Sequence, residues 1–334
     1  MKTRSIIICL TMMLFMAATH CFAQESALTN RYSMKLTKND DGSYSLQKRE
    51  RYAKIINLDA IEDLTVPYTY VNDRLTSKLY KNTETEIRTY KKYESYELQL
   101  AIDKAVTENP APVMFFCHGE GWERGSFESS KSLSRYLAQQ HGITCVRVSY
   151  TLANQPGAHV EVSIQDIMDA VKYICDNAGS LNIDPKRIGF YGTSAGAHLA
   201  ACAAMKNENT KVLIGYSGIY DLTTAAITTR AKTEMRKAYF GQLDPKVLKN
   251  ASPAYMIPKK QKIAVQLYCG TGDITVEWSQ SKDFADKLKN ADKRNKIDLV
   301  VYENYDHNLS SKGSDKMEEI FFKTAEFIAE NLLN

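Results

Sequence analysis

The sequence lacks the features that mark several large classes of protein. Its seven cysteines and six histidines include no cluster with the spacing of a metal site. The formal net charge is only +4 and no dense Lys/Arg block is interleaved with aromatic residues, so a nucleic-acid partner is not expected. The short basic cluster at 259–262 is interpreted as a solvated approach to a strand. No internal repeat or low-complexity tract is present. We therefore expect neither a metal nor an organic cofactor.

Long apolar runs are also missing after the N-terminus, so no membrane span is expected. Residues 1–23 have the pattern of a secretory signal peptide, with an apolar run at Ile6–Ala18 that is too short to cross a bilayer. Cleavage is expected before Gln24. Lipid attachment at Cys21 is the alternative, which the bulky His20 disfavours, and a buried core helix is a third. The pattern predicts a periplasmic or secreted protein that is soluble once processed.

Cysteine is too scarce and too irregular to form a disulfide framework. Removing Cys9 and Cys21 with the signal leaves five cysteines, and an odd number cannot pair fully within one chain. Each of the five lies in an apolar run, where a free thiol behaves as a small hydrophobic group. We expect mostly buried thiols at Cys117, Cys145, Cys175, Cys202 and Cys269.

The chain divides by composition into three parts. Residues 24–80, after the signal, form a polar segment in which 32–38 and 43–48 alternate like the strands of a hairpin. This segment is predicted to be a β-rich extension. Residues 81–334 are predicted to form the main domain of the chain, because short apolar runs and helical patterns alternate through them.

The apolar runs predict an α/β fold. They are rich in β-forming residues and apolar enough for strands that are buried on both faces of a parallel sheet. Helical periodicity is clearest at 164–175 and in the closing run at 315–333. We predict a mostly parallel eight-stranded sheet with helices on both faces. The eight predicted strands are 85–90 and 97–102, which form an antiparallel opening pair, then 113–117, 143–149, 187–191, 211–216, 263–269 and 297–302.

Gly192-Thr193-Ser194-Ala195-Gly196 is the most informative stretch of the chain. It follows an apolar strand and precedes a helix-forming run, which is the context that a G-x-S-x-G nucleophile elbow requires. The small residues permit the tight turn, and the helix N-terminus favours developing negative charge. Ser194 is therefore predicted to be a catalytic nucleophile.

A serine nucleophile needs a base and an acid, which follow it in the order Asp/Glu and then His. Only His198 and His307 come after Ser194. His198, one helical turn beyond the serine, is expected to pack in the core, so His307 is the predicted base. Asp273, in a glycine-rich loop after a strand, is the predicted acid. The weaker alternatives to this acid are Asp221, Glu277, Glu303 and Asp306.

The tetrahedral intermediate also requires N–H donors for its oxyanion, each worth about 3–4 kcal/mol. The residue after the nucleophile, Ala195, is predicted to provide one donor. The others are expected from the loop His118-Gly119-Glu120-Gly121-Trp122, which follows the 113–117 strand. Its glycines allow the backbone to approach a substrate closely.

These motifs together resemble the α/β-hydrolase esterases that carry an H-G-G-G-W loop. That group includes bacterial feruloyl and acetylxylan esterases and, more distantly, the hormone-sensitive-lipase group. The resemblance runs from about residue 85 onward and implies a serine carboxylesterase with an α/β-hydrolase fold. It also assigns the loop donors to Glu120 and Gly121. Glu120 departs from the usual glycine, so its side chain is expected to point away or to select small neutral acyl groups.

The expected substrate is an acylated plant oligosaccharide or polysaccharide, or a related small ester. Segment 223–255 is expected to shape the pocket mouth, where Tyr239 and Phe240 either contact substrate or pack. One rival is a formamidase, because T-S-A-G-A-H-L also resembles kynurenine formamidases. Prolyl-peptidase-like hydrolases are a second, although they usually carry a large aromatic residue at the position of Ala195. An inactive carbohydrate-binding homologue is a rival from another class.

Overall fold

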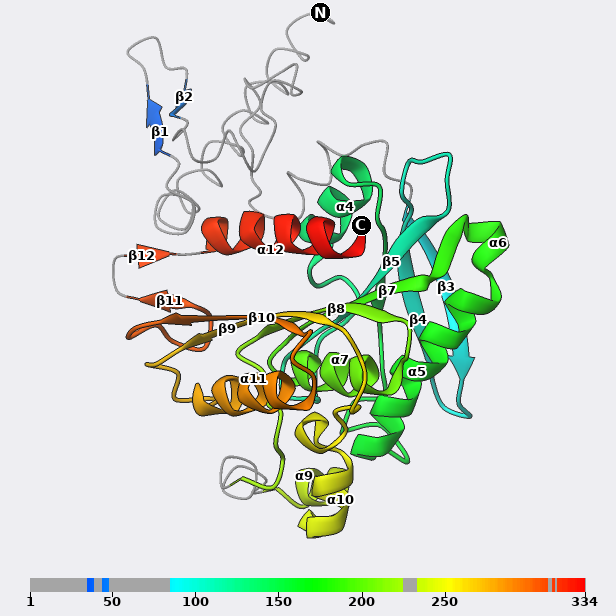
Figure 1. The fold of residues 1–334 in the computed structure, drawn as a ribbon, viewed down its shortest axis with the longest axis vertical. Coiled ribbons are helices and arrows are strands. Elements are labelled where there is room, and N and C mark those ends of the chain that lie inside the picture. Colours follow the sequence, from blue (N-terminus) through cyan, green and yellow to red (C-terminus); the bar gives the residue numbers. More distant parts are fainter. Residues whose placement is uncertain are drawn as a thin grey trace, which may run out of the picture. The chain divides into compact units, whose positions relative to one another are not determined.

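The computed structural model describes residues 85–224, 233–311, 314–315 and 317–333, together with two short strands near the N-terminus (Figure 1). The chain separates into two compact units, Met1–Lys81 and Asn82–Asn334. The predicted signal peptide, 1–23, and most of the predicted extension, 24–80, lie outside the described residues.

The described residues of the first unit form one antiparallel pair. Strand β1 (Lys35–Lys38) pairs with β2 (Tyr44–Gln47), and Leu36 lies opposite Leu46. The alternating pattern in the sequence predicted this hairpin, and the pairing confirms it.

The second unit is built on an eight-stranded sheet with the order β10-β9-β8-β7-β5-β6-β4-β3. Strands β3 and β4 are antiparallel to each other and β4 is antiparallel to β6, whereas the remaining neighbours are parallel. All eight predicted strands and the antiparallel opening pair are confirmed. The strands are β3 (Thr85–Lys92), β4 (Glu97–Asp103), β5 (Ala111–Cys117), β6 (Thr144–Val148), β7 (Ile183–Thr193), β8 (Thr210–Tyr216), β9 (Ala264–Gly270) and β10 (Lys296–Tyr302).

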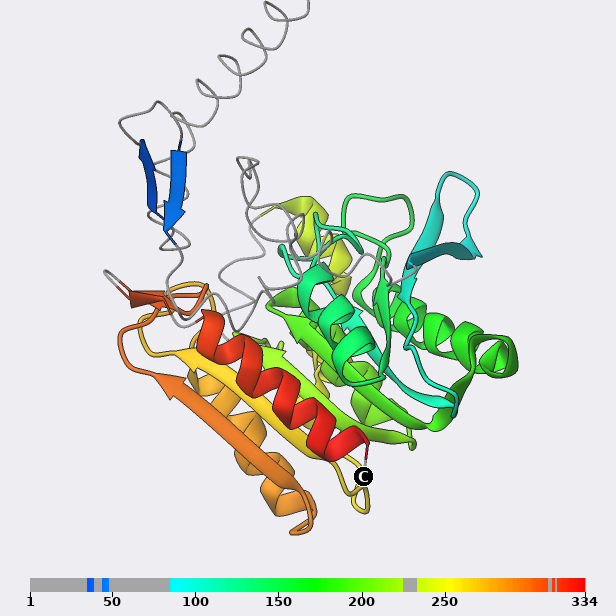
Figure 2. The same ribbon diagram turned by 90° about the horizontal axis from the view of Figure 1, so that it is seen from above.

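Helices cover both faces of this sheet, as predicted (Figures 1 and 2). One face carries α4 (Lys131–Gln140) and α12 (Met317–Leu332), and the other carries α5 (Val160–Asp176), α7 (Ala195–Lys206) and α11 (Ser279–Ala291). The shorter elements are α6 (Ala178–Leu181), α9 (Glu234–Tyr239), α10 (Pro245–Asn250), the 3-10 turns η2 (Gly241–Leu243) and η3 (Pro253–Tyr255), and the two-residue strands β11 (Ser310–Ser311) and β12 (Ser314–Asp315).

Alternation along β5 explains why its sequence is apolar throughout. Val113 and Phe115 point into the core that contains α5, α7 and α11, whereas Met114 and Phe116 point into the core beneath α4 and α12. All four side chains are buried. Complete burial of such a side chain stabilises the fold by about 1.5–3 kcal/mol, so the central strands hold the two helical layers together.

The described cysteines behave as small hydrophobic groups, as expected. All five are free thiols; Cys175 is half-buried and the other four are buried. Burial raises the pKa of Cys269 to about 11, so this thiol stays protonated at neutral pH. No helix among the residues that the structure describes is both long and apolar enough to cross a membrane.

Candidate active site

Ser194 occupies a sharp turn between the end of β7 and the start of α7. Its backbone has φ 52° and ψ −121°, a conformation that costs about 1–3 kcal/mol for a residue with a side chain. The Ser194 amide donates to Tyr216 O at 2.8 Å, which ties the turn to β8. Helix α7 behind it is buried from Ala195 to Met205. The neighbouring strand and this buried helix therefore hold the strained turn in place.

The glycines that flank Ser194 are required by close backbone contacts. A Cβ on Gly192 would lie 2.2 Å from Gly196 O, and one on Gly196 would lie 2.1 Å from Cys117 O. Both contacts are with backbone, so neither can be relieved by a side-chain rotation. The G-x-S-x-G pattern is thus a packing requirement of the point where β5, β7 and α7 meet.

We expect Gly196→Ala to destabilise the fold by about 3 kcal/mol or more, because the methyl group would force β5 and α7 apart. Gly179→Ala in α6 is the matched control, since a Cβ there meets nothing within 4 Å. That control should change stability by less than about 1 kcal/mol. Urea unfolding of the two variants measures the difference, and equal midpoints would contradict the close contact.

Three side chains from separate loops meet at the carboxyl ends of the strands. His307 Nε2 lies 2.9 Å from Ser194 Oγ, and His307 Nδ1 lies 2.7 Å from Asp273 Oδ2. The Asp273 carboxylate is 1% exposed, whereas the His307 ring is 21% exposed. A continuous hydrogen-bonded chain therefore runs from a buried carboxylate through an accessible imidazole to the serine hydroxyl. The structure brings together all three residues that the sequence predicted.

Backbone amides hold Asp273 in position. Its Oδ1 accepts from Thr275 N at 2.7 Å and from Val276 N at 2.8 Å, which leaves Oδ2 for the imidazole. Gly270, at the end of β9, packs against the next loop, because a Cβ there would lie 2.1 Å from Tyr305 O. The acid and base loops are consequently packed against each other before any substrate binds.

The loop that carries His307 is organised by its neighbour Asp306. The Asp306 carboxylate accepts from the amides of Asn308 and Ser310, at 2.9 and 3.0 Å. Ser217 Oγ, after β8, donates to His307 O at 3.0 Å. Asp306, a weak alternative acid in the sequence, therefore closes the turn that presents the base.

The other alternative residues lie elsewhere. Asp221 accepts from the Tyr255 hydroxyl and from Thr223, so its carboxylate belongs to a separate loop contact. His198 is fully buried, as expected. Trp122 Nε1 donates to His198 Nδ1 at 3.3 Å, and His198 Nε2 lies 2.7 Å from Ala251 O. His198 thus links the loop after β5 to the segment that precedes η3.

Burial lowers the pKa of both His198 and His118 to about 4, from a usual value of 6.5. The unfolded chain binds more protons than the folded one between these values, so stability is complete above pH 6.5 and declines as pH falls toward 4. We expect each histidine to cost about 2 kcal/mol of unfolding free energy between pH 7 and pH 5. His198→Gln, which preserves a donor and an acceptor, should remove about half of that loss in urea titrations. An unchanged pH slope would contradict this prediction.

The loop after β5 has an unusual backbone. Glu120, Gly121 and Trp122 have consecutive φ values of 69°, 67° and 61°. The loop lies against the elbow, because a Cβ on Gly119 would be 2.8 Å from Thr193 O. The Glu120 side chain is 60% exposed, with its carboxylate 4.0 Å from Arg124 Nε. Two non-glycine residues therefore sit in the left-handed region beside the nucleophile.

The predicted oxyanion donors are three backbone amides, two in the loop after β5 and one at the start of α7. Within the described part of the chain, the amides of Glu120, Gly121 and Ala195 donate to no protein acceptor. Ala195 is the first residue of α7, so its N–H also lies at the positive end of the helix dipole. The arrangement can accept a developing negative charge next to Ser194.

Aromatic residues pack against Trp122 at the end of the loop 118–122. Trp122 packs edge-on against Phe240, with ring centroids 5.1 Å apart, and against Tyr239 at 6.4 Å. Tyr239 and Phe240 are 1% and 3% exposed. Of the two roles considered for them in the sequence, the structure shows packing. Segment 223–255, of which 225–232 lies outside the described residues, therefore supports the loop through these two rings.

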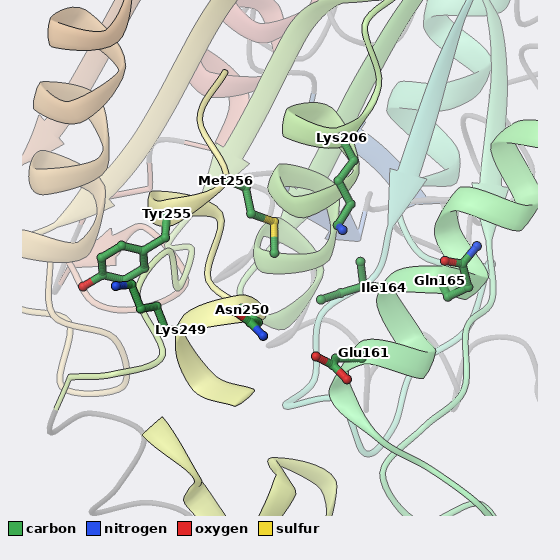
Figure 3. A pocket seen from close by; sticks show the side chains of 8 residues that line it. All are labelled: Glu161, Ile164, Gln165, Lys206, Lys249, Asn250, Tyr255 and Met256. Atoms are coloured by element: carbon green, nitrogen blue, oxygen red, sulfur yellow. The ribbon is translucent and has the colours of Figure 1, made fainter. Parts of the chain in front are cut away.

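A pocket of about 510 Å³ lies away from Ser194, Asp273 and His307 (Figure 3). Lys206 and Asn250 are among the residues that line it, and Lys249 Nζ lies 5.3 Å from the centre of the Tyr255 ring. None of the residues that line it belongs to the Ser194 site. No cluster of metal-ligating side chains occurs among the residues described.

Sequence reasoning missed three supporting contacts of the site. These are the Trp122–His198 hydrogen bond, the Ser217–His307 contact and an ion pair between Glu123 and Arg236. Only the first left a signal, since a buried indole N–H requires an acceptor. The other two join segments that no local pattern relates.

Comparisons with known proteins agree with this architecture. Residues 98–288 match the model of the BD-FAE family. An arylesterase of Saccharolobus solfataricus is 30% identical over 172 residues, which cover 51% of this chain and 56% of the relative. A probable isoprenylcysteine alpha-carbonyl methylesterase of Oryza sativa subsp. japonica is 28% identical over 221 residues, covering 60% and 52%. The chain thus spans about half the length of the curated relatives it matches.

Among solved structures, the propionate-bound esterase Est2 of Thermogutta terrifontis superposes with a TM-score of 0.61 at 24% sequence identity. The match covers 75% of this chain and 93% of that one. This likeness establishes the α/β-hydrolase fold.

Proposed function

Because the chain belongs to the BD-FAE family, we propose that it is a serine carboxylesterase that hydrolyses short acyl esters. One observation carries the proposal: His307 lies within hydrogen-bond distance of both Ser194 Oγ, at 2.9 Å, and Asp273 Oδ2, at 2.7 Å. A serine hydroxyl is a poor nucleophile at neutral pH, and this arrangement supplies the base that activates it.

The reaction proceeds in two halves. His307 Nε2 accepts the Ser194 proton as Oγ attacks the acyl carbon, and Asp273 stabilises the imidazolium that forms. The free amides of the loop and of Ala195 bind the oxyanion. The imidazolium then donates its proton to the departing alcohol, which leaves the acyl group on Ser194 Oγ. Water attacks that ester with the same base and releases the acid.

The finer substrate class we propose is an acetyl or feruloyl ester on a plant oligosaccharide or polysaccharide. Its support is the resemblance of the elbow and of the loop 118–122 to feruloyl and acetylxylan esterases, together with the pattern of a signal peptide in residues 1–23. The Glu120 side chain is exposed, so its carboxylate does not prevent the N–H groups of the loop from binding the oxygen of a neutral acyl group.

Purified protein tested on p-nitrophenyl acetate, acetylated and feruloylated xylo-oligosaccharides, and N-formylkynurenine separates the alternatives. We expect turnover of the acetate ester and a higher kcat/KM on one of the sugar esters. A preference for N-formylkynurenine would replace the ester proposal with amide hydrolysis. Absence of any hydrolysis, with retained binding of xylo-oligosaccharides, would support a binding protein instead.

We further propose that the protein is exported to the periplasm or secreted. The basis is the order of a basic start, an apolar run and small residues before Gln24. Mass spectrometry of the protein recovered after expression of the full chain should find an N-terminus at Gln24. An unprocessed N-terminus in the cytoplasmic fraction would overturn export and leave the proposed chemistry untouched.

A further inference from the structure

The geometry points to the Glu123–Arg236 ion pair as a clamp that holds the oxyanion loop, residues 118–122, in its binding conformation. Glu123 follows the loop directly, and Arg236, in α9, lies 113 positions further along the chain than Glu123. Both are positioning residues: they act through the loop backbone and do not contact the reacting atoms. This inference rests on the proposed esterase function for its catalytic consequence.

The loop needs such support because its backbone is strained. Three consecutive residues have positive φ, and two of them, Glu120 and Trp122, are not glycine. Left-handed backbone costs each of these residues free energy that the surroundings must offset. The loop carries two of the proposed oxyanion donors, so relaxation of the strain would move those N–H groups away from the substrate oxygen.

Arg236 reaches this strained segment directly. A Cβ built on Gly121 would lie 3.5 Å from Arg236 Nη2, so the guanidinium covers the loop at one of the proposed donors. The same side chain donates from Nε to the Glu123 carboxylate. The two side chains are 35% and 25% exposed, so solvent screens their attraction only in part.

Helix α9 is itself firmly anchored. The Tyr239 hydroxyl donates to Ser163 Oγ at 2.8 Å, and Ser163 Oγ donates to Thr151 O at 2.6 Å. Phe240, directly after α9, packs on Trp122. The ion pair of Arg236, within α9, and the ring contact of Phe240, directly after it, therefore hold the loop against this anchored helix at two separate points.

Breaking the ion pair should weaken transition-state binding more than substrate binding, because the oxyanion exists only in the transition state. We expect Glu123→Gln and Arg236→Met each to lower kcat about tenfold on p-nitrophenyl acetate, with KM changed less than about twofold. The double variant should cost no more than Arg236→Met alone, since Glu123 is proposed to act only through Arg236. Matched controls are Glu128→Gln and Lys237→Met, which break exposed ion pairs with Lys131 and Glu234 and should leave kcat unchanged.

A second measurement reports on the conformation of the loop without requiring any catalytic turnover. The chain has two tryptophans, Trp122 and Trp278, and Trp122 is 7% exposed. In a Trp278→Phe background, acrylamide quenching of Trp122 fluorescence should rise about twofold or more in both clamp variants, and in neither control. The quenching measurement tests the clamp even if the wild-type protein hydrolyses no ester. That absence of hydrolysis would overturn the proposed function but not the clamp. Quenching equal to wild type, or additive losses of kcat in the double variant, would overturn the clamp.

Discussion

Ser194→Ala is expected to lower kcat on p-nitrophenyl acetate by about 10⁴-fold or more. The alanine methyl group cannot attack the acyl carbon, so no acyl-enzyme forms and only the oxyanion donors remain to assist water. Substitution should leave the fold intact, because the hydrogen bond from the Ser194 amide to Tyr216 O and the elbow backbone do not involve the hydroxyl. Stopped assays at high enzyme concentration, with urea unfolding alongside, measure both effects.

Ser217→Ala is the matched control for this substitution. Its hydroxyl also lies near the base, but it donates to the backbone oxygen of His307 and not to the ring. We expect a loss of less than about tenfold, since the Asp306 turn continues to hold the loop. If the Ser194→Ala variant retained more than a tenth of the wild-type activity, Ser194 would be excluded as the nucleophile. Intact-protein mass spectrometry tests the same point independently. It should detect an acyl adduct on the wild-type protein and none on Ser194→Ala.

Asp273→Asn is expected to lower kcat by about 10⁴-fold while changing stability little. The asparagine carbonyl can still accept from the amides of Thr275 and Val276, which directs its NH₂ group at His307 Nδ1. A donor at that position forces the ring proton onto Nε2. The imidazole then presents an N–H to Ser194 Oγ and cannot accept its proton, so the base is disabled in an almost unchanged geometry.

Asp221→Asn provides the comparison, because Asp221 was the alternative acid and its carboxylate contacts Tyr255 and Thr223 instead. This variant should retain kcat within about twofold. The pair of substitutions tests which strand supplies the acid, β8 or β9. Comparable losses in both variants would mean that the His307–Asp273 contact does not determine the tautomer.

Sequence patterns were sufficient for the parts of the molecule that depend on local order. The strands were predictable because runs such as 113–117 are apolar on both faces, and the elbow because Gly192 and Gly196 admit no Cβ. Ser194 and His307 followed from chain order in a sheet whose loops meet at one edge. These features require only nearby residues or the general rule for parallel sheets.

Features that depend on tertiary contacts were out of reach. The acid was partly within reach: the sequence favoured Asp273 over Asp221, which also follows a strand and a glycine, and only the contacts in the fold confirm that preference. Helix α9 has six residues, too few for a periodic pattern, so nothing in the sequence predicted that Arg236 would meet Glu123. Tyr239 and Phe240 were ambiguous for the same reason, since an aromatic residue suits a binding surface and a core equally well.

The separation of Ser194 from His307 along the chain also matters while the protein is being made. The base follows β10, an edge strand, so the nucleophile has no partner until that strand and the turn after it have left the ribosome. A nascent chain that has formed the elbow but not this turn therefore lacks the imidazole that lies against Ser194. Recovery of activity during refolding should accordingly require that β10 and the turn after it have folded next to β9, so it reports on completion of this edge of the sheet.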